Sequence, residues 1–351
     1  MKAVRFDAYG GPEVLRYGDH PLPEVGRSDV LVRVLASCVT GWDLKLRSGV
    51  FPKLPGRRTW PLPMQPGRNA AGVVEAVGED VRAFRPGDRV AGLVHPADPH
   101  SPLAIRGLGN LSTGVDYPGH TMFGGNAQYV SRPDTYWLPL PDTVGFQDAA
   151  AALWSYATSH RVLTDRLGAR LGDCVLVTGA SGGMGTATLD LARLMGVRTV
   201  AVTRSRAKEA FLRERGASEV LVLPRDDAPA AVRAAHDPLG LDGAVDYTGQ
   251  HAMVRLGLDC LRPGGTMVVL AGEGSKEPLP VTTQDCIALE LNLRGARAST
   301  VHDQRTVLRL LAEGGIRPAI HAVVPLSGIR EAHVLLAKGE VTGRLIVDPW
   351  A

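Results

Sequence analysis

Apolar residues follow two different rhythms along the chain. Up to about residue 150 they form short runs, at residues 30–35, 71–77 and 88–91, in which apolar positions alternate with polar or small ones. Gly, Pro and Asp bound these runs, and Pro86-Gly87-Asp88 is a turn signal between two of them. The pattern predicts a β-rich segment whose strands are joined by tight turns.

From residue 156 to residue 298 apolar strands alternate with helical segments, which predicts a doubly wound α/β domain with a parallel sheet. The expected strands lie at residues 175–177, 199–202, 219–223, 243–246 and 266–270. Beyond this domain the pattern predicts two amphipathic helices and a closing strand, at residues 306–316, 329–338 and 343–347.

The sequence VLVTGASGGMG at residues 175–185 predicts a dinucleotide-binding turn. A buried strand breaks into small residues and a helix follows. Glycines let the backbone turn sharply and approach a pyrophosphate, and a helix N-terminus offers unpaired N–H groups and a partial positive charge. We therefore expect cofactor contacts from Ser181, Gly182, Gly183 and Met184.

The end of the second strand indicates which dinucleotide binds. An acidic residue there usually holds the free 2′-hydroxyl of NADH, whereas the 2′-phosphate of NADPH needs cations and hydroxyls. This chain reads TRSRAK over residues 203–208, without a carboxylate. We expect NADPH, held by Thr203, Arg204, Ser205 and Lys208. The alternative is that these cations only form a solvated helix start, where they would oppose the helix dipole.

Composition narrows the class of protein. The chain has 351 residues, long enough for two domains, with 44% hydrophobic and 21% charged residues. Its net charge is +3 and it has no dense basic block, which disfavours nucleic acid as a partner. No apolar run approaches the roughly 20 residues of a membrane span. A small-molecule substrate is the expected partner.

The N-terminus and the cysteines favour a cytoplasmic protein. A strand pattern begins at once, which leaves no room for a signal peptide. The four cysteines are scattered without a CxxC pair and are expected to be free thiols in a reducing compartment: Cys38, Cys174, Cys260 and Cys286.

With these pieces placed, the chain resembles the medium-chain dehydrogenase/reductase family over its whole length. The resemblance rests on several short motifs that occur together: YGGPEVL (9–15), PG (66–67), AGVVEAVG (71–78), RPGDRV (85–90), GNAQYV (125–130), the glycine turn, LRPGG (261–265) and GR (343–344). It implies a GroES-like catalytic domain over residues 1–155, a Rossmann NADP-binding domain over 156–298, and a C-terminal segment, 299–351, that returns to the first domain. It also implies a homodimer or homotetramer and further cofactor contacts at Thr248, Ala271, Ala298 and Arg344.

The chain departs from the zinc-dependent branch of this family at all three catalytic zinc positions. Those positions, a Cys, a His and a later Cys or Asp, align with Thr40, Arg68 and Trp154. None of these side chains is a plausible zinc ligand. The lobe that carries the structural zinc, residues 95–114, contains no cysteine. His95, Asp98 and His100 lie in this Pro-rich loop, but we expect no metal there.

Without zinc, the chemistry has to come from side chains. The catalytic candidates are Thr40, Asp43, Arg68 and Tyr156, and the expected substrate-pocket residues are Trp42, Asn69 and Trp154. Asp43 is the acid that the family places nearest to Arg68, so an ion pair between them is expected. Arg68 or Asn69 could then hydrogen-bond a developing oxyanion.

Three functions remain open from the sequence. The first is a zinc-independent NADPH-dependent reductase of an activated C=C bond, as in quinones, enones and enoyl thioesters. The second is a zinc-independent NADPH-dependent carbonyl or imine reductase. The third is a protein that binds NADPH without catalysing a reaction.

Overall fold

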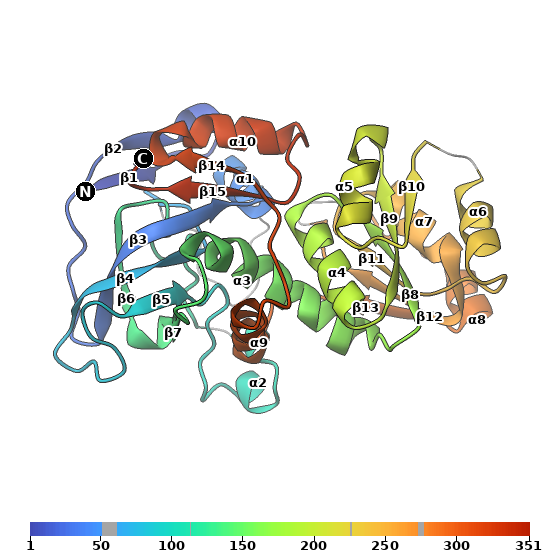
Figure 1. The fold of residues 1–351 in the computed structure, drawn as a ribbon, viewed down its shortest axis with the longest axis horizontal. Coiled ribbons are helices and arrows are strands. Elements are labelled where there is room, and N and C mark those ends of the chain that lie inside the picture. The colour runs from blue at the N-terminus through green and yellow to red at the C-terminus, as the bar shows by residue number, and fades with distance from the viewer. Residues whose placement is uncertain (51–61, 113, 225–226, 273–276) are drawn as a thin grey trace. The chain divides into compact units, whose positions relative to one another are not determined.

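The computed structural model describes residues 1–50, 62–112, 114–224, 227–272 and 277–351, and the chain divides into two compact units (Figure 1). Unit 1 comprises Met1–Ala157 and Ala298–Ala351, and unit 2 comprises Thr158–Arg297. The boundaries lie close to those expected at residues 155/156 and 298/299. Helix α3 (Phe146–Arg161) runs from unit 1 into unit 2.

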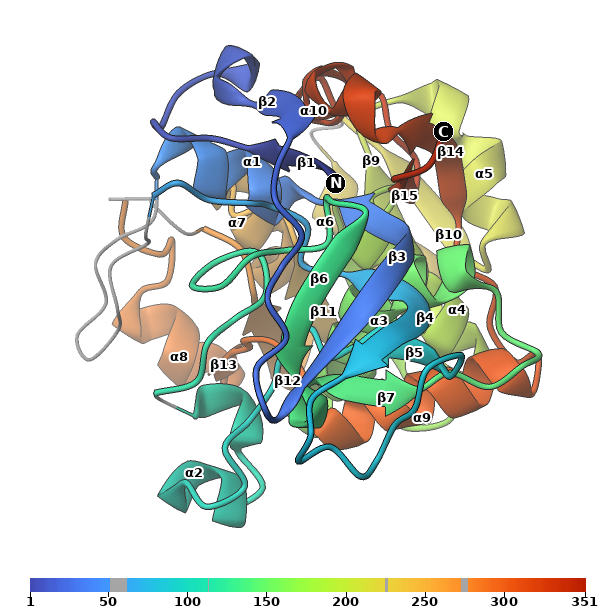
Figure 2. The same cartoon turned by 90° about the vertical axis from the view of Figure 1, so that its left-hand side faces the viewer.

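Unit 1 is built on a seven-stranded sheet with the order β14-β15-β3-β4-β5-β7, and β6 also pairs with β3 (Figure 2). The strands are β3 (Asp29–Val39), β4 (Ala70–Val77), β5 (Arg89–Gly92), β6 (Tyr129–Pro133), β7 (Trp137–Pro139), β14 (Ile320–Pro325) and β15 (Arg344–Asp348). A separate antiparallel pair is formed by β1 (Lys2–Arg5) and β2 (Arg16–Asp19). The helices of this unit besides α3 are α1 (Gly41–Ser48), α2 (Pro102–Ile105), α9 (Val301–Ala312) and α10 (Ile329–Ala337).

The β-rich prediction for the first 150 residues is confirmed, and so is the return of the C-terminal segment to it. β15 pairs with β3 through Leu345 opposite Val39 and Ile346 opposite Cys38. One helix starts earlier than expected: α9 begins at Val301 rather than near residue 306. Thr300 and Asp303 cap it, since Asp303 Oδ2 accepts from the Thr300 amide over 2.8 Å and Thr300 Oγ1 accepts from the Asp303 amide over 3.2 Å.

Unit 2 holds a six-stranded, wholly parallel sheet with the order β10-β9-β8-β11-β12-β13. In chain order this is the arrangement of a doubly wound dinucleotide-binding fold, as predicted. The strands are β8 (Cys174–Thr178), β9 (Arg198–Thr203), β10 (Glu219–Val222), β11 (Leu241–Asp246), β12 (Leu261–Val269) and β13 (Asn292–Gly295). The helices are α4 (Gly183–Leu194), α5 (Glu209–Glu214), α6 (Ala228–Ala235), α7 (His251–Cys260) and α8 (Thr283–Leu289).

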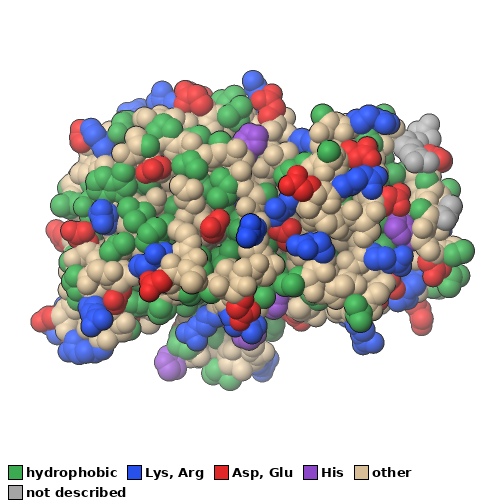
Figure 3. Space-filling model, in the orientation of Figure 1, with side chains coloured by type: hydrophobic (Ala, Val, Ile, Leu, Met, Phe, Trp, Pro, Cys, Tyr) green, Lys and Arg blue, Asp and Glu red, His purple; other side chains and the backbone are tan. Residues whose placement is uncertain are grey.

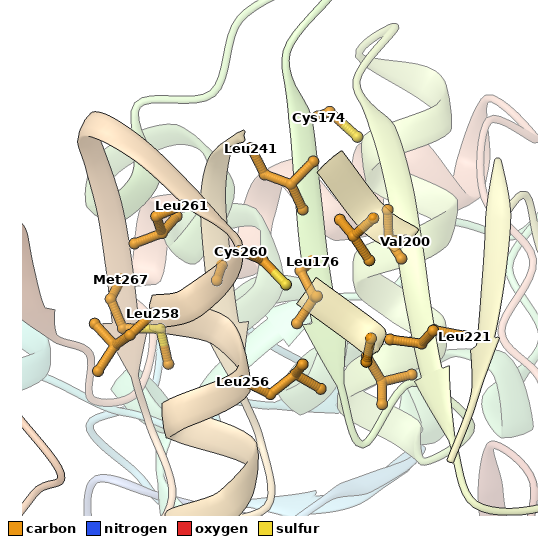
Figure 4. Close-up of a cluster of buried hydrophobic side chains, with 14 of the residues drawn as sticks. Cys174, Leu176, Val200, Leu221, Leu241, Leu256, Leu258, Cys260, Leu261 and Met267 are labelled. Carbon is orange, nitrogen blue, oxygen red and sulfur yellow. The ribbon is translucent and has the colours of Figure 1, made fainter. Parts of the chain in front are cut away.

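The core of unit 2 explains why its strands read as continuous apolar runs. Leu176, Val200 and Met267, from three different strands, are fully buried against apolar side chains of α7 (Figure 4). A strand covered by helices on both faces has no solvent side, so it needs no alternation of polar residues.

The strand expected at residues 266–270 is the second half of β12, and it lies inside the sheet. β12 pairs with β11 on one side and with β13 on the other. It therefore cannot provide a free edge for subunit pairing; β13 is the edge strand on that side.

Two features describe the helices and one face of the surface. Within the described ranges, none of the helices combines the length and the apolar character that crossing a membrane would require. Figure 3 shows acidic and basic side chains interspersed on the face in view. That face shows no large cluster of basic side chains of the kind that binds nucleic acid.

Candidate functional site

The glycine-rich turn of unit 2 has the predicted strand–turn–helix geometry. β8 ends at Thr178, Gly179 turns the chain with φ +64°, and α4 begins at Gly183. Gly185 packs tightly on the turn, because a Cβ at this position would lie 2.4 Å from Cα of Ala180. The first N–H groups of a helix have no acceptor within the helix, so the start of α4 offers donors to an anion.

The end of β9 brings the predicted phosphate-binding residues to the same turn. Thr203 Oγ1 accepts a hydrogen bond from the Ser205 amide over 3.1 Å. Nζ of Lys208 donates to Ser181 Oγ over 3.3 Å, which ties the end of the second strand to the glycine turn. Burial, and then the charge of Arg204, lowers the pKa of Lys208. An ammonium group and hydroxyls therefore lie beside the glycine turn, a set of residues that fits a dinucleotide of the NAD(P) type.

The other expected cofactor residues belong to different segments of the two units. Thr248 follows β11 and donates its hydroxyl to Asp246 Oδ1 over 2.7 Å, so this hydroxyl is already used within unit 2. Ala271 follows β12 and is half-buried. Ala298 and Arg344 belong to unit 1, and Ala298 adopts a left-handed backbone with φ +59°.

A buried hydroxyl network supports the start of α4 and was not foreseen from the sequence. The Tyr247 hydroxyl lies 2.7 Å from Thr188 Oγ1, and Thr188 Oγ1 donates to Ser159 Oγ over 3.0 Å. Ser159 Oγ also donates to the Met184 carbonyl over 3.1 Å. Burial raises the pKa of Tyr247 to about 12. The residues that carry these three hydroxyls are far apart in the sequence, so no sequence motif predicts the network.

Arg68 is the centre of an aromatic cluster in unit 1. Its guanidinium carbon lies 4.6 Å from the ring centroid of Trp154, 5.3 Å from that of Tyr117 and 5.6 Å from that of Trp42. Nε donates to the Val94 carbonyl over 3.1 Å, and the residue is only 5% exposed. Cation–π contacts and a backbone acceptor thus hold a permanent charge in largely dry surroundings.

Asp43 does not form the ion pair with Arg68 that the sequence led us to expect. Its Oδ2 accepts from the amide of Thr40 over 2.8 Å and from Thr40 Oγ1 over 2.6 Å, and its Oδ1 accepts from the Gly67 amide over 3.3 Å. These contacts from Thr40 and Gly67, rather than a hydrogen bond from Arg68, hold its two oxygens. Burial raises the pKa of Asp43, and these hydrogen bonds and the more distant charge of Arg68 oppose the rise. Thr40 and Asp43 therefore cap α1 and hold the Gly67–Arg68 segment.

Two further candidates are engaged in packing. Tyr156 is 1% exposed and donates its hydroxyl to the Arg317 carbonyl over 3.2 Å, which fastens α3 to the C-terminal segment. Asn69 is 1% exposed and donates its amide to the Ala150 carbonyl over 2.7 Å. One of its two amide N–H groups is therefore used within unit 1.

Two histidines that the sequence did not single out as catalytic join the Arg68 cluster. The Trp42 indole donates to Nδ1 of His120 over 3.2 Å, and the two rings stack with centroids 4.8 Å apart. His95 stands edge-on to Trp154, with a centroid distance of 5.8 Å, and its Nδ1 accepts from the Ser299 amide over 3.3 Å. Both lie in Gly- and Pro-rich loops without a recognisable spacing, so only the fold brings them together.

The side chains that the resemblance aligns with the zinc positions are not typical zinc ligands. The structure brings Arg68 and Trp154 into contact and links Thr40 to the Gly67–Arg68 segment through Asp43. A hydroxyl used in a helix cap, a guanidinium and an indole are not the ligands that zinc takes in proteins. In the part of the chain that the structure describes, no three His, Cys, Asp or Glu side chains are grouped so that they could hold a metal ion.

Comparison with known proteins matches both units. Residues 26–142 match the alcohol dehydrogenase GroES-like domain, and residues 183–313 match the zinc-binding dehydrogenase family. A quinone oxidoreductase of Lama guanicoe is 30% identical over 344 residues, which are 95% of this chain and 92% of that protein.

Solved structures match over the same length. A crystal structure of AibC is 34% identical, with a TM-score of 0.88, and the match covers 99% of this chain and 95% of that one. A crystal structure of an NAD-dependent alcohol dehydrogenase is 31% identical, with a TM-score of 0.91 and 99% of both chains covered. The chain therefore belongs to the medium-chain dehydrogenase/reductase family, whose members are oxidoreductases that bind NAD(P).

Proposed function

We propose that this protein is a zinc-independent, NADPH-dependent reductase that transfers hydride to an activated C=C bond of a quinone, enone or enoyl substrate. The observation that carries the proposal is the guanidinium of Arg68, held between aromatic rings at the family's second zinc position. A fixed cation can stabilise an oxyanion without a metal, and aromatic walls suit a flat conjugated substrate.

The reaction needs little acid–base chemistry from the protein. NADPH, when bound, supplies a hydride to the β-carbon of the conjugated system. The π electrons move toward the carbonyl oxygen, and the resulting negative charge is what the Arg68 guanidinium can stabilise. A proton from water then completes the α-carbon. Trp42, Tyr117 and Trp154 exclude bulk water from around the guanidinium, which strengthens its effect.

The preference for NADPH rests on unit 2. Thr203 stands at the end of β9 where an NADH-binding protein would place an acid, and Lys208 reaches the glycine turn from the same side. Arg204 is exposed next to them. This set of donors and cations suits a 2′-phosphate, which is an anion with several hydrogen-bond acceptors.

We further propose that the protein forms a homodimer or homotetramer through β13. All four residues of this edge strand are exposed, and apolar side chains surround it: Leu293 is 38% exposed and Ile287 on α8 is 70% exposed. An exposed, partly apolar edge is an aggregation liability unless it is paired. Light scattering tests this, because a monomer at all concentrations would contradict it.

Consumption of NADPH over a substrate panel tests the proposed activity. The panel contains quinones, enones, enoyl thioesters, aldehydes and cyclic imines, and we expect turnover with the first three classes. With NADPH deuterated at the transferred position, deuterium should appear at the β-carbon of the product. Turnover of aldehydes or imines alone would favour the carbonyl or imine reductase, and no turnover would favour a non-catalytic NADPH-binding protein.

Arg68→Met tests the role of the guanidinium. It keeps the length and apolar stem of the side chain and should reduce kcat by about 10²–10³-fold, the usual effect of removing one oxyanion-stabilising donor. Arg106→Met, at an exposed position, is the matched control. Full turnover by the Arg68 variant would indicate that Arg68 has only a structural role.

A further inference from the structure

Helix α4 begins without a side-chain cap. Its N-cap residue is Gly182, which has no side chain that could accept from the amides of the first turn. The first turn is held through a carbonyl instead, because the Met184 carbonyl lies 3.1 Å from Ser159 Oγ and 3.0 Å from Thr188 Oγ1, both of which can donate to it. Ser159 and Thr188 are fully buried. The position of this turn therefore depends on buried hydroxyl groups.

Tyr247 contacts the glycine turn and the helix that follows it. It comes directly after β11, and its hydroxyl lies 2.7 Å from Thr188 Oγ1 on α4. A Cβ at Gly179 would lie 3.4 Å from the Cβ of Tyr247, so the base of the tyrosine side chain lies next to the residue that turns the chain. One side chain thus packs beside the start of the turn and reaches α4 with its hydroxyl.

The distances indicate which way each hydroxyl donates. A carbonyl oxygen can only accept, so Ser159 donates to Met184. The Thr188 proton is shared between Ser159 Oγ and the Met184 carbonyl, each 3.0 Å away, which leaves Tyr247 as the donor to Thr188. If Thr188 donated to Tyr247 instead, the acceptor left for the phenol among the described residues would be Ser159 Oγ, 3.5 Å away. All three protons therefore point toward the Met184 carbonyl.

Tyr247 keeps its proton at physiological pH. Burial raises its pKa to about 12, and the hydrogen bonds with Ser159 and Thr188 reduce this rise. The phenol is therefore a permanent donor at the start of this chain of hydrogen bonds. Hydrogen bonds in a chain polarise one another, so the loss of the first donor weakens the bonds that follow it.

We infer that Tyr247 is a positioning residue for the pyrophosphate of the cofactor: through Thr188 and Ser159 it fixes the first turn of α4, where the phosphate oxygens would bind. The inference rests on the cofactor site of the proposed function but not on the substrate class. It holds for NADPH and NADH alike, because both carry the pyrophosphate. A displaced first turn would weaken contacts to the pyrophosphate and spare those to the 2′-phosphate, which are expected from residues 203–208.

³¹P NMR of NADP⁺ bound to the protein separates these two sets of contacts within one ligand. In Tyr247→Phe, which removes only the hydroxyl, we expect the bound pyrophosphate signals to shift and the 2′-phosphate signal to stay in place. Affinity for NADP⁺ should fall by roughly three- to tenfold. Affinity for adenosine 2′-monophosphate, which has no pyrophosphate, should not change. Equal shifts of all the phosphorus signals, or no shift of any, would overturn the inference.

Thr188 provides a second test with a conservative rescue. Thr188→Val keeps the shape of the side chain but removes the central hydroxyl, so it should weaken NADP⁺ binding at least as much as Tyr247→Phe. Thr188→Ser keeps the hydroxyl and should bind almost as tightly as the wild type. Thr199→Val is the matched control, because Thr199 is also fully buried in unit 2 and its hydroxyl has no hydrogen-bond partner among the described residues.

The double variant Tyr247→Phe/Thr188→Val should bind NADP⁺ no more weakly than Thr188→Val alone, since both residues act through one chain of hydrogen bonds. Additive losses would contradict that chain. If NAD⁺ binds more tightly than NADP⁺, the proposed NADPH preference is wrong, and the pyrophosphate signals of bound NAD⁺ then provide the same test. If both single variants bind either nucleotide as tightly as the wild type, the positioning role is rejected, whatever the substrate proves to be.

Discussion

Lys208 and Ser181 join the two halves of the expected cofactor site, since the Lys208 ammonium group donates to the Ser181 hydroxyl over 3.3 Å. One residue follows the second strand of the parallel sheet, and the other lies in the glycine turn after the first. A 2′-phosphate near Thr203 would meet both a cation and a hydroxyl.

Thr203→Asp should therefore reverse the cofactor preference. A carboxylate at this position can accept from the 2′-hydroxyl of NADH and repels the 2′-phosphate of NADPH. Each lost charge-assisted hydrogen bond costs about 1.5–3 kcal/mol, so NADPH affinity should fall by at least about tenfold. Fluorescence titration with both cofactors measures the ratio, and Thr283→Asp on exposed α8 controls for added charge. Tighter binding of NADH by the wild type would refute the preference itself.

Chelation should leave the enzyme unaffected, because the side chains at the three zinc positions are not zinc ligands. We expect substoichiometric zinc in elemental analysis of untagged protein. Dialysis against EDTA should change neither turnover nor thermal stability. One zinc per chain would show that the alignment of Thr40, Arg68 and Trp154 with the ligand positions is wrong.

The sequence predicts the fold better than it predicts the site. Five of the six parallel strands, the glycine turn and the closing strand at residues 343–347 are predicted from the sequence, because each depends on a local pattern of apolar, small and turn-forming residues; β13 is not predicted. The start of α9 was missed, although Thr300 and Asp303 form a recognisable capping box. The spacing of apolar residues alone predicts a start near residue 306, later than the observed start at Val301.

The site was harder because its contacts join residues far apart in the sequence. The Trp42–His120 and His95–Ser299 bonds span 78 and 204 residues, and no spacing rule connects such positions. The Asp43–Arg68 pair failed for a different reason. The opposite charges of the two side chains suggested an ion pair. Asp43 lies three residues after Thr40 at the start of α1, however, where its carboxylate accepts the capping hydrogen bonds from Thr40.

Asp43→Asn and Asp43→Ala should separate these two roles. Asn keeps an acceptor for the Thr40 amide, so its cost in unfolding free energy should be small. Ala leaves buried donors unsatisfied and should cost about 1–3 kcal/mol. Urea denaturation measures both. Equal destabilisation by the two variants would indicate that the charge near Arg68, rather than the cap, is what matters.

His333 should make the protein sensitive to acid. It is fully buried on α10, neither ring nitrogen has a hydrogen-bond partner among the described residues, and burial followed by the charge of Arg47 lowers its pKa to about 3. The unfolded chain binds the proton below about pH 6.5 and the folded chain does not. Its contribution is therefore intact above that value and is lost as pH falls toward 3.

From pH 7 to pH 5 this histidine should account for about 2 kcal/mol of lost unfolding free energy. His333→Leu should remove that part of the loss. Exposed His100→Gln should not. Parallel urea curves at the two pH values make the comparison, and the same acid loss in His333→Leu as in the wild type would exclude this histidine as the cause.

We expect Arg132 to lower the free energy of unfolding of the protein. It is fully buried on β6, its Nε and Nη1 have no partner in the described part of the chain, and burial lowers its pKa to about 9. Arg132→Met should raise the unfolding free energy at pH 7 by about 1–4 kcal/mol. The gain should shrink above pH 9, where the folded wild type releases the proton. Exposed Arg106→Met is the control, and a destabilised Arg132 variant would show that the guanidinium is needed.

The place of β15 between β14 and β3 sets the order in which the chain can mature during synthesis. Unit 2 is a continuous segment and can complete its sheet as soon as it leaves the ribosome. Residues 1–157, made earlier, wait until residues 344–348 have been translated before β3 gains that neighbour. The end of β3 at residues 37–39 thus lacks its β15 neighbour throughout the synthesis of unit 2, and this is the interval in which chaperones would protect it.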